Sequence, residues 1–316
     1  MLRSGVALVV ASVPEGMVAT TTHAIGVNAL RQKDVVVRRL DAIETMAAVN
    51  VVCFDKTGTL TENRMSVAEA AREIADLFLH TEDLGRLAHA VEQGRTTHAN
   101  IRKSLRFILS TNSSEVLLML AAAAFGLGEG LTPMQLLWIN VITDVLPGIG
   151  LALEGADPRA LEQGPPSPDL PIIGDGEIAV LLSEGATLAG GALIAAAYGA
   201  HRFGANSPHM RSMTFSSLVG AQLQHVLACR TPGEYFFQRT DLQANPTLTK
   251  ILIGAFALQV GAYAIPPLRR ALDLASVGLS AAAISALSSV LPSLITLWRT
   301  SKPAQPALSQ LLEVRT

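Results

Sequence analysis

The sequence predicts an all-α, multi-pass membrane bundle of about seven transmembrane helices, with one small residual α/β segment on the cytoplasmic side. Two observations lead to this fold class. Of the 316 residues, 49% are hydrophobic and only 16% are charged. The apolar residues are also grouped into long blocks, close to the length of about 20 residues that a helix needs to cross a bilayer.

Seven such blocks follow one another along the chain. The fifth is the shortest and the most polar, since it contains Gln222, Gln224 and His225. Pro14 and Glu15 interrupt the first, which argues against a cleaved signal peptide. We predict membrane helices at Gly5–Ala29, Leu105–Gly126, Thr132–Leu153, Ile178–Ala200, Met213–Cys229, Leu248–Ile265 and Ser276–Trp298.

The distribution of Lys and Arg predicts the orientation of these helices. If the polar stretch after the first block is cytoplasmic, all but five of the 24 basic residues lie on the cytoplasmic side. We therefore expect a multi-pass integral protein of the plasma (inner) membrane, in contact with membrane lipid. The net charge of −2 gives no reason to expect a nucleic-acid partner.

The long polar stretch contains the sequence VVCFDKTGTLTEN, residues 51–63. We predict a strand at Val49–Phe54 that ends in Asp55, and a helix-forming composition over Val67–Arg95. An Asp carboxylate can attack phosphorus as a nucleophile. The alternative is an ordinary junction between strand and turn, where the Asp only caps the turn.

The residues after Asp55 fit a phosphate-binding turn. Lys56 adds positive charge beside the carboxylate, and Thr57 adds a hydroxyl. Backbone N–H groups of such a turn can hold a phosphate. The candidate catalytic residues are Asp55, Lys56 and Thr57, and the candidate phosphate-binding residues are Thr57, Gly58 and Thr59.

The first apolar block carries a candidate cation site. Pro14 cannot continue a helical hydrogen-bond ladder, so carbonyls in the preceding turn are freed. Those of Val10, Ala11 and Val13 could face a cation beside Glu15.

Two further blocks carry polar residues at helical spacing. Asn112 and Glu115 are three residues apart, and Asn140, Thr143 and Asp144 stand at i, i+3 and i+4. Each set shares one helix face, and such residues inside a membrane usually mark an ion path. Oxygen ligands suit Ca²⁺, although Na⁺ or another cation stays open. For any one of these residues alone, a hydrogen bond between helices is the alternative.

Several segments together resemble the P-type cation-transporting ATPases, in the calcium-pump-like P2 branch. DKTGTLT is similar to the motif whose Asp is phosphorylated in that family, and PEG at 14–16 resembles the broken fourth helix. SLRFILSTNSSEV, LLWINVITD, MTFSSLVGAQLQHVLACR and NPTLTKILIGAFALQ resemble the fifth, sixth, eighth and ninth helices. The resemblance implies ATP and Mg²⁺ as cofactors in the intact family, a phosphorylation segment of the haloacid-dehalogenase type, and Ca²⁺ as the transported cation.

This chain departs from the family in two ways. Gln222 stands where two-site calcium pumps have an acid, which weakens a second divalent site. Near Ser66–Ala71 the sequence passes directly from one side of the family's catalytic region to the other, without a nucleotide-binding domain between them. It also contains no TGDGxND motif to hold Mg²⁺. We therefore expect that this chain alone does not hydrolyse ATP. The front helices, the actuator and the nucleotide-binding domain would either be supplied by a second chain or have been lost through an error in the gene model.

The resemblance divides the chain into six parts. They are a fourth-helix-like span (1–29), a truncated cytoplasmic phosphorylation segment (30–103), a transmembrane hairpin (104–153), a cytoplasmic loop (154–177), a four-helix region (178–300) and a tail (301–316). The main hypothesis is a cation transporter derived from a P-type ATPase. The alternatives are a non-catalytic remnant that binds cations or associates with an intact pump, and a small phosphatase built on Asp55, which Thr57 disfavours because such enzymes place an acid there.

Overall fold

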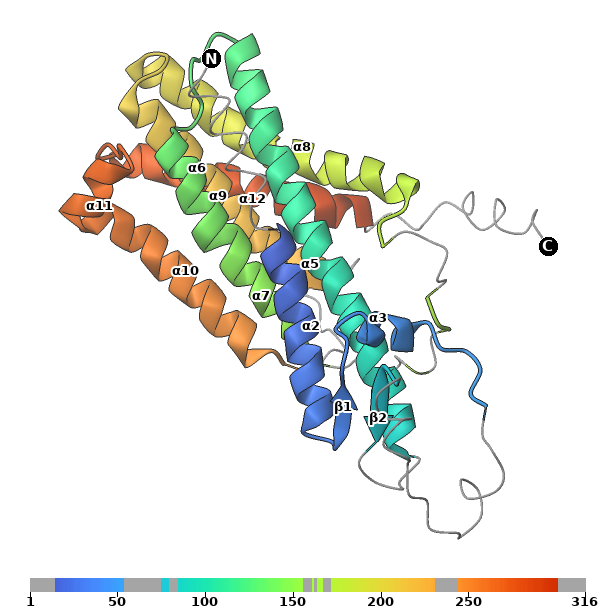
Figure 1. Ribbon diagram of the computed structural model, residues 1–316. Helices are drawn as coiled ribbons and strands as arrows, with labels where there is room; N and C mark the ends of the chain where they lie inside the picture. Colours follow the sequence, from blue (N-terminus) through green and yellow to red (C-terminus); the bar gives the residue numbers. More distant parts are fainter. Residues whose placement is uncertain are drawn as a thin grey trace, which may run out of the picture.

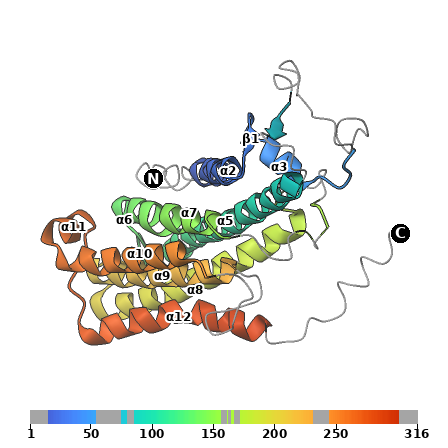
Figure 2. The same cartoon turned by 90° about the horizontal axis from the view of Figure 1, so that it is seen from below.

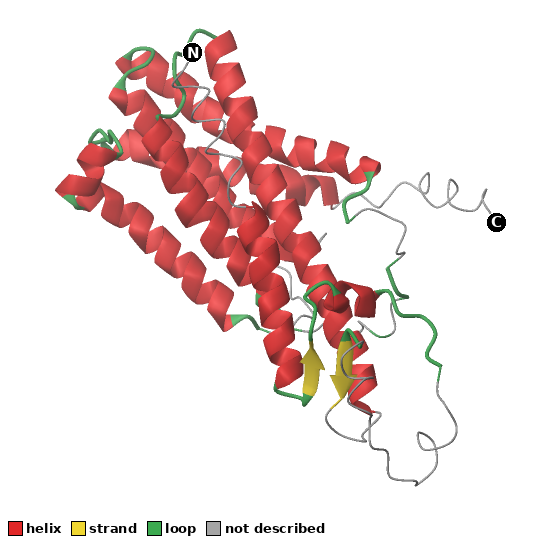
Figure 3. Cartoon of the chain, viewed as in Figure 1, coloured by secondary structure: helices red, strands yellow, loops and turns green. Residues whose placement is uncertain are grey.

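The computed structural model describes residues 15–53, 75–79, 85–155, 161, 164–166, 172–230 and 244–300. Within these ranges the chain is mostly helical, as Figure 3 shows. The longest helix, α5 (Gly85–Ala124), has 40 residues and extends beyond the bundle at one end. That end also carries the only two strands of the described part, and we call it the polar end (Figure 1).

Five helical stretches in the described part are long and apolar enough to cross a membrane. They correspond to five of the predicted blocks, so these five predictions are confirmed. The stretches comprise α5, then α6 (Pro133–Ile139) with η2 (Asn140–Val145) and α7 (Leu146–Ala152), α8 (Asp175–Phe203), α10 (Pro246–Ala264) and α12 (Leu279–Thr300).

The other two predicted blocks are helical where the structure describes them, but these helices do not meet the same criterion. The first is described only from residue 15, as α2 (Glu15–Arg31). The fifth forms α9 (Pro208–Arg230), whose 23 residues are long enough to span a bilayer but are less apolar. The count of seven spans therefore stays a prediction.

The helix α9 owes its polar composition to its place in the bundle. It packs against α8 and α12 and also contacts α5, and Figure 2 shows it beside α8 and α10. Fifteen of its residues are buried, including Ser217, Gln222 and His225. Because these side chains face other helices, they can hydrogen-bond without meeting lipid. Large apolar side chains lie outward instead on α10 and α12, where Ile253 is 65% exposed and Leu287 69%.

Small residues bring α8 close to its neighbours. A Cβ atom at Gly185 would lie 2.8 Å from Ser113 Cβ and 2.9 Å from Ser110 O of α5. On the same helix, a Cβ at Gly191 would lie 2.6 Å from Ser288 O of α12. Close approach at small residues is the usual way in which membrane helices associate.

Hydrogen bonds join the helix ends near the polar end. Arg230, at the end of α9, donates to both carboxylate oxygens of Glu154 at 2.8 and 2.7 Å. Asn245 Nδ2 donates to Gly150 O at 3.0 Å and to Glu154 Oε2 at 3.2 Å. Asn100 Nδ2 of α5 donates to Glu154 O at 2.8 Å. Glu154 thus connects α5, α7, α9 and the start of α10.

At the opposite end, the short helix α11 (Pro266–Ala271) follows α10.

The polar end contains a small sheet in a place that the sequence did not predict. The strand β1 (Val35–Val37) pairs antiparallel with β2 (Leu77–Leu79), with Val36 opposite Phe78. The helix α3 (Ala42–Ala47) packs against α5. The strand at 77–79 lies within the stretch for which we predicted a helical composition.

The predicted strand at Val49–Phe54 is wrong in its described part. Residues 49–53 form no strand, and Val51 is 72% exposed. A strand requires a neighbour to satisfy its backbone groups, and the two short strands of the described part pair with each other instead. The haloacid-dehalogenase type of this segment therefore stays a prediction.

Candidate functional site

The candidate site begins at an irregular turn within a membrane stretch. Between α6 and α7 the chain forms a π-helix, η2, over Asn140–Val145. π-Helical turns are rare in proteins, and those that do occur are often found at functional sites. The wider turn places Asn140, Thr143 and Asp144 inside the bundle, where they are 3%, 0% and 0% exposed.

The helix α5 supplies the second group of side chains. Glu115 is 1% exposed and Asn112 is half-buried, with its amide oxygen shielded from solvent. Ser114, which the sequence analysis did not select, is fully buried and donates to Thr111 O at 2.6 Å. Glu115 lies near Asp144 of η2, so the two buried carboxyl groups influence each other.

Gln222 of α9 connects these two groups. Its Nε2 donates to Glu115 Oε1 at 3.2 Å and lies 3.5 Å from Ser114 Oγ. Its Oε1 lies 3.2 Å from Thr143 Oγ1, whose single hydroxyl proton is shared with Ile139 O at 2.7 Å. The amide at this position thus joins α5, η2 and α9. The structure brings together four of the predicted residues, Glu115, Thr143, Asp144 and Gln222. Asn112 and Asn140 lie on the same two elements, α5 and η2.

Three carboxylate oxygens in this group are shielded from solvent and accept no hydrogen bond from the described residues. They are Glu115 Oε2 and both Oδ atoms of Asp144. A buried carboxylate without a partner is costly. Carboxylate, amide and hydroxyl oxygens are the ligands that hard cations such as Ca²⁺ prefer. No group of three or more His, Cys, Asp and Glu side chains forms a metal site in the described ranges, so neutral oxygens would have to complete any coordination.

The remaining predicted residues lie elsewhere. Val10, Ala11 and Val13 fall outside the described residues, as do Asp55, Lys56, Thr57, Gly58 and Thr59. Glu15 is the first residue of α2, but its side chain is not described. The helix α2 itself packs against α5 and α7.

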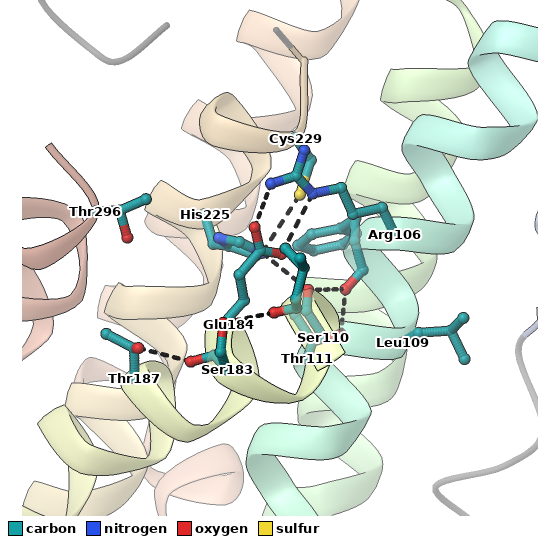
Figure 4. A network of polar contacts seen from close by, with 12 residues as sticks. Arg106, Leu109, Ser110, Thr111, Ser183, Glu184, Thr187, His225, Cys229 and Thr296 are labelled. Carbon is teal, nitrogen blue, oxygen red and sulfur yellow. Dashed lines mark hydrogen bonds and ion pairs between the residues drawn. The ribbon is translucent and has the colours of Figure 1, made fainter. Parts of the chain in front are cut away.

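The structure also shows a second buried polar group that the sequence analysis did not select (Figure 4). Arg106 of α5 forms an ion pair with Glu184 of α8, and its Nε also donates to Glu184 Oε2 at 3.3 Å. His225 Nε2 lies 3.6 Å from Glu184 Oε2 and 2.8 Å from Ser110 Oγ. Cys229 Sγ lies 3.3 Å from the same ring nitrogen.

A sequence signal for this second group did exist. Glu184 is the single acid in the predicted block Ile178–Ala200, and an ionisable residue within a span marks a functional or paired position. Its partner Arg106 stands 78 positions away on another helix, so the pair itself was not visible in the sequence.

Comparisons with known proteins bear on this arrangement. Residues 128–301, more than half of the chain, match the family described as "Cation transporting ATPase, C-terminus". The chain is 29% identical over 238 residues to the human (Homo sapiens) calcium-transporting ATPase type 2C member 2, covering 75% of this chain and 24% of that protein. It is 30% identical over 187 residues to a calcium-transporting ATPase of Bacillus subtilis, covering 59% of this chain and 20% of that protein. The chain therefore spans about a quarter or less of the length of these relatives.

Proposed function

Because the chain belongs to the cation-transporting ATPase family, in the C-terminal region of these P-type pumps, we propose that it forms the ion-binding membrane part of a calcium transporter. It is an integral membrane protein with five helices of spanning length in its described part. The relatives are calcium-transporting ATPases, and Ca²⁺ is the proposed cargo here.

One observation carries this proposal: the buried carboxylate oxygens of Glu115 and Asp144 that the described residues leave without hydrogen bonds. A divalent cation would neutralise both carboxylates and replace their mutual repulsion with attraction. Asn112, Asn140 and Thr143 offer neutral oxygens from the same two elements. Since Gln222 is uncharged and bonded to Glu115, we propose one divalent site in this cluster, without a second strong one.

Equilibrium binding of radiolabelled Ca²⁺ to the purified chain in detergent tests this site. We expect Asp144→Asn and Glu115→Gln each to weaken binding roughly a hundredfold, because each removes one of two ligand charges. Glu129→Gln is the matched control, since Glu129 is exposed in the loop after α5. Unchanged Ca²⁺ affinity in both site variants would contradict the proposal, and competition by Na⁺ at equal concentration would assign the site to a different cation.

For catalysis, we propose that this chain alone does not form an aspartyl-phosphate, and that Asp55 acts only with a nucleotide-binding domain from another chain. Phosphoryl transfer depends on positioning and on metal charge. The sequence between Asp55 and α5 contains no TGDGxND motif to hold Mg²⁺. Incubation with γ-labelled ATP, Ca²⁺ and Mg²⁺ should leave the purified chain unlabelled. A hydroxylamine-sensitive label that disappears in Asp55→Asn would overturn this proposal.

We also propose that the chain lies in the plasma (inner) membrane with its polar end in the cytoplasm. The two cysteines allow a direct test, because Cys53 is exposed near the polar end and Cys229 is buried in α9. A membrane-impermeant thiol reagent should label the chain in inside-out vesicles and leave right-side-out vesicles unlabelled. Cys53→Ser should abolish the labelling. Labelling of right-side-out vesicles instead would reverse the orientation.

A further inference from the structure

The helix α10 buries a glutamine that is not part of the cation site. The residues that α10 buries against the bundle share one helix face, because steps of seven, four and three residues return to the same side. They are Leu248, Ala255, Gln259 and Ala262. Gln259 is 8% exposed and is the polar member of this face. An amide inside a membrane bundle usually marks a function or a hydrogen bond between helices.

The side chain of Gln259 has one hydrogen-bond partner in the described part of the chain, and that partner is Trp138 of α6. Trp138 Nε1 donates to Gln259 Oε1 at 3.0 Å. Gln259 Nε2 is shielded from solvent and makes no hydrogen bond with a described residue. A buried donor without an acceptor costs stability, and an apolar side chain at this position would avoid that cost. Stability alone therefore does not explain the amide.

Trp138 stands at the edge of the irregular turn that carries the cation site. It is the next-to-last residue of α6, and the π-helix η2 begins at Asn140. Farther from the turn, Gln135 Nε2 donates to Leu272 O at 3.0 Å and holds the first part of α6. The bond between Trp138 and Gln259 is thus the one that fixes α6 next to η2.

The helix α10 also contacts the chain on the other side of this turn. It runs alongside α6 and α7 in the opposite direction, as Figure 1 and Figure 2 show. At the start of α10, Asn245 Nδ2 donates to Gly150 O of α7 at 3.0 Å. A Cβ atom at Gly150 would lie 2.6 Å from Leu248 Cδ1, so the two helices are in close contact there. One uninterrupted helix therefore holds both sides of η2.

Fixed contacts on both sides matter because of the geometry of a π-helix. Its turn contains more residues than an α-helical turn, and its hydrogen bonds run from i to i+5. If one residue of η2 returned to α-helical geometry, α6 would rotate by about 100° and move by about 1.5 Å relative to α7. The side chains of η2 would then change direction, including that of Thr143, which contacts Gln222. A bond that holds Trp138 in place opposes this rotation.

We propose that Gln259 is a positioning residue for the cation site: through Trp138 it holds α6, so that η2 keeps Thr143 beside Gln222 and Asp144 inside the bundle. This inference rests on the proposed Ca²⁺ site. Gln259 does not bind the ion, and its amide acts through the backbone of α6.

Ca²⁺ affinity and stability, measured together on the full chain in detergent, test the proposal. Trp138→Phe/Gln259→Leu removes the donor and the acceptor at once, and such a replacement by apolar groups is nearly neutral for stability. Without Ca²⁺, the midpoint of chemical denaturation should stay at or above that of the parent chain. Ca²⁺ binding should weaken about fivefold, the effect of losing the positioning that one hydrogen bond supplies.

Gln224→Leu is the matched control, because it also removes an amide that bonds a neighbouring helix, at Ser289 O of α12. It should leave Ca²⁺ affinity within about twofold of the parent value, since Gln224 has no bond to the α6 and η2 stretch among its hydrogen bonds to described residues.

Backbone hydrogen exchange tests the same point without Ca²⁺. In Trp138→Phe/Gln259→Leu, amide exchange at residues 140–145 should become about fivefold faster, while exchange in α12 stays unchanged. Stability that falls together with affinity, unchanged affinity, or unchanged exchange at 140–145 would each overturn the proposal. If the parent chain binds no Ca²⁺, the proposed cation site fails, whereas the exchange comparison still decides whether Gln259 holds the turn.

Discussion

Two buried polar groups share the helices α5 and α9, and they treat their carboxylates in opposite ways. Around Glu184, both carboxylate oxygens have partners, from Arg106 and His225. Around Glu115 and Asp144, three of the four carboxylate oxygens accept no hydrogen bond from any described residue. The first group uses its charges to join helices. The second leaves buried carboxylate oxygens without a hydrogen bond, and these are the atoms to which we propose that a cation binds.

Breaking the ion pair between Arg106 and Glu184, which we call the paired group, should produce the largest effect on stability. We expect Glu184→Ala to lower the free energy of unfolding by about 3–5 kcal/mol, because the partly buried Arg106 loses its counter-charge. Denaturation in mixed detergent micelles measures this free energy. The double variant Arg106→Met/Glu184→Leu should recover most of the lost stability. If Glu184→Ala is as stable as the parent chain, the ion pair does not stabilise the fold and the two polar groups do not differ in this way.

At the cation site, removing a charge should stabilise the protein. Without Ca²⁺, Asp144→Asn should raise the free energy of unfolding by about 2 kcal/mol, since it removes a buried charge that has no partner. The gain should grow as the pH rises, because only the ionised carboxylate carries this cost. At saturating Ca²⁺, the parent chain should instead have the higher free energy of unfolding. A variant less stable than the parent under calcium-free conditions would show that Asp144 is compensated within the chain.

The contact between α5 and α8 should matter for the paired group and leave the cation site unaffected. Gly185→Ala places a Cβ 2.8 Å from Ser113 Cβ and should cost about 1–2 kcal/mol of unfolding free energy, with Ca²⁺ affinity unchanged. Gly190→Ala is the control, because a Cβ at Gly190 meets nothing within 4 Å. A loss of Ca²⁺ affinity in Gly185→Ala would show that the paired group and the cation site are coupled.

The smallest effect should come from adding a charge at the cation site. Gln222→Glu should raise Ca²⁺ affinity roughly tenfold, since a third carboxylate would face the ion. Gln224→Glu provides the comparison on the same helix, because Gln224 faces α12 and donates to Ser289 O at 3.2 Å. Equal changes in the two variants would mean that net charge, and not the position of Gln222, sets the affinity.

The sequence by itself determined the membrane helices and most of the candidate ligands. Bilayer thickness fixes the length of an apolar block, so five spans could be predicted from hydropathy alone and were confirmed. Polar residues at helical spacing also identified Glu115 and Asp144, because local periodicity decides which side chains share a face. The weak apolarity of the fifth block reflected its burial within the bundle.

Only the tertiary structure decided which of these side chains have partners. Gln222 meets Glu115 across 107 positions, and Arg106 meets Glu184 across 78. No local pattern encodes such pairs. The same holds for the sheet, where Val36 pairs with Phe78, while residues 49–53, apolar enough for a strand, pair with no strand of the described part. Hydrogen-bond partners come from distant segments, and folding alone gives Glu184 an ion-pair partner while both carboxylate oxygens of Asp144 are left without a hydrogen bond from the described residues.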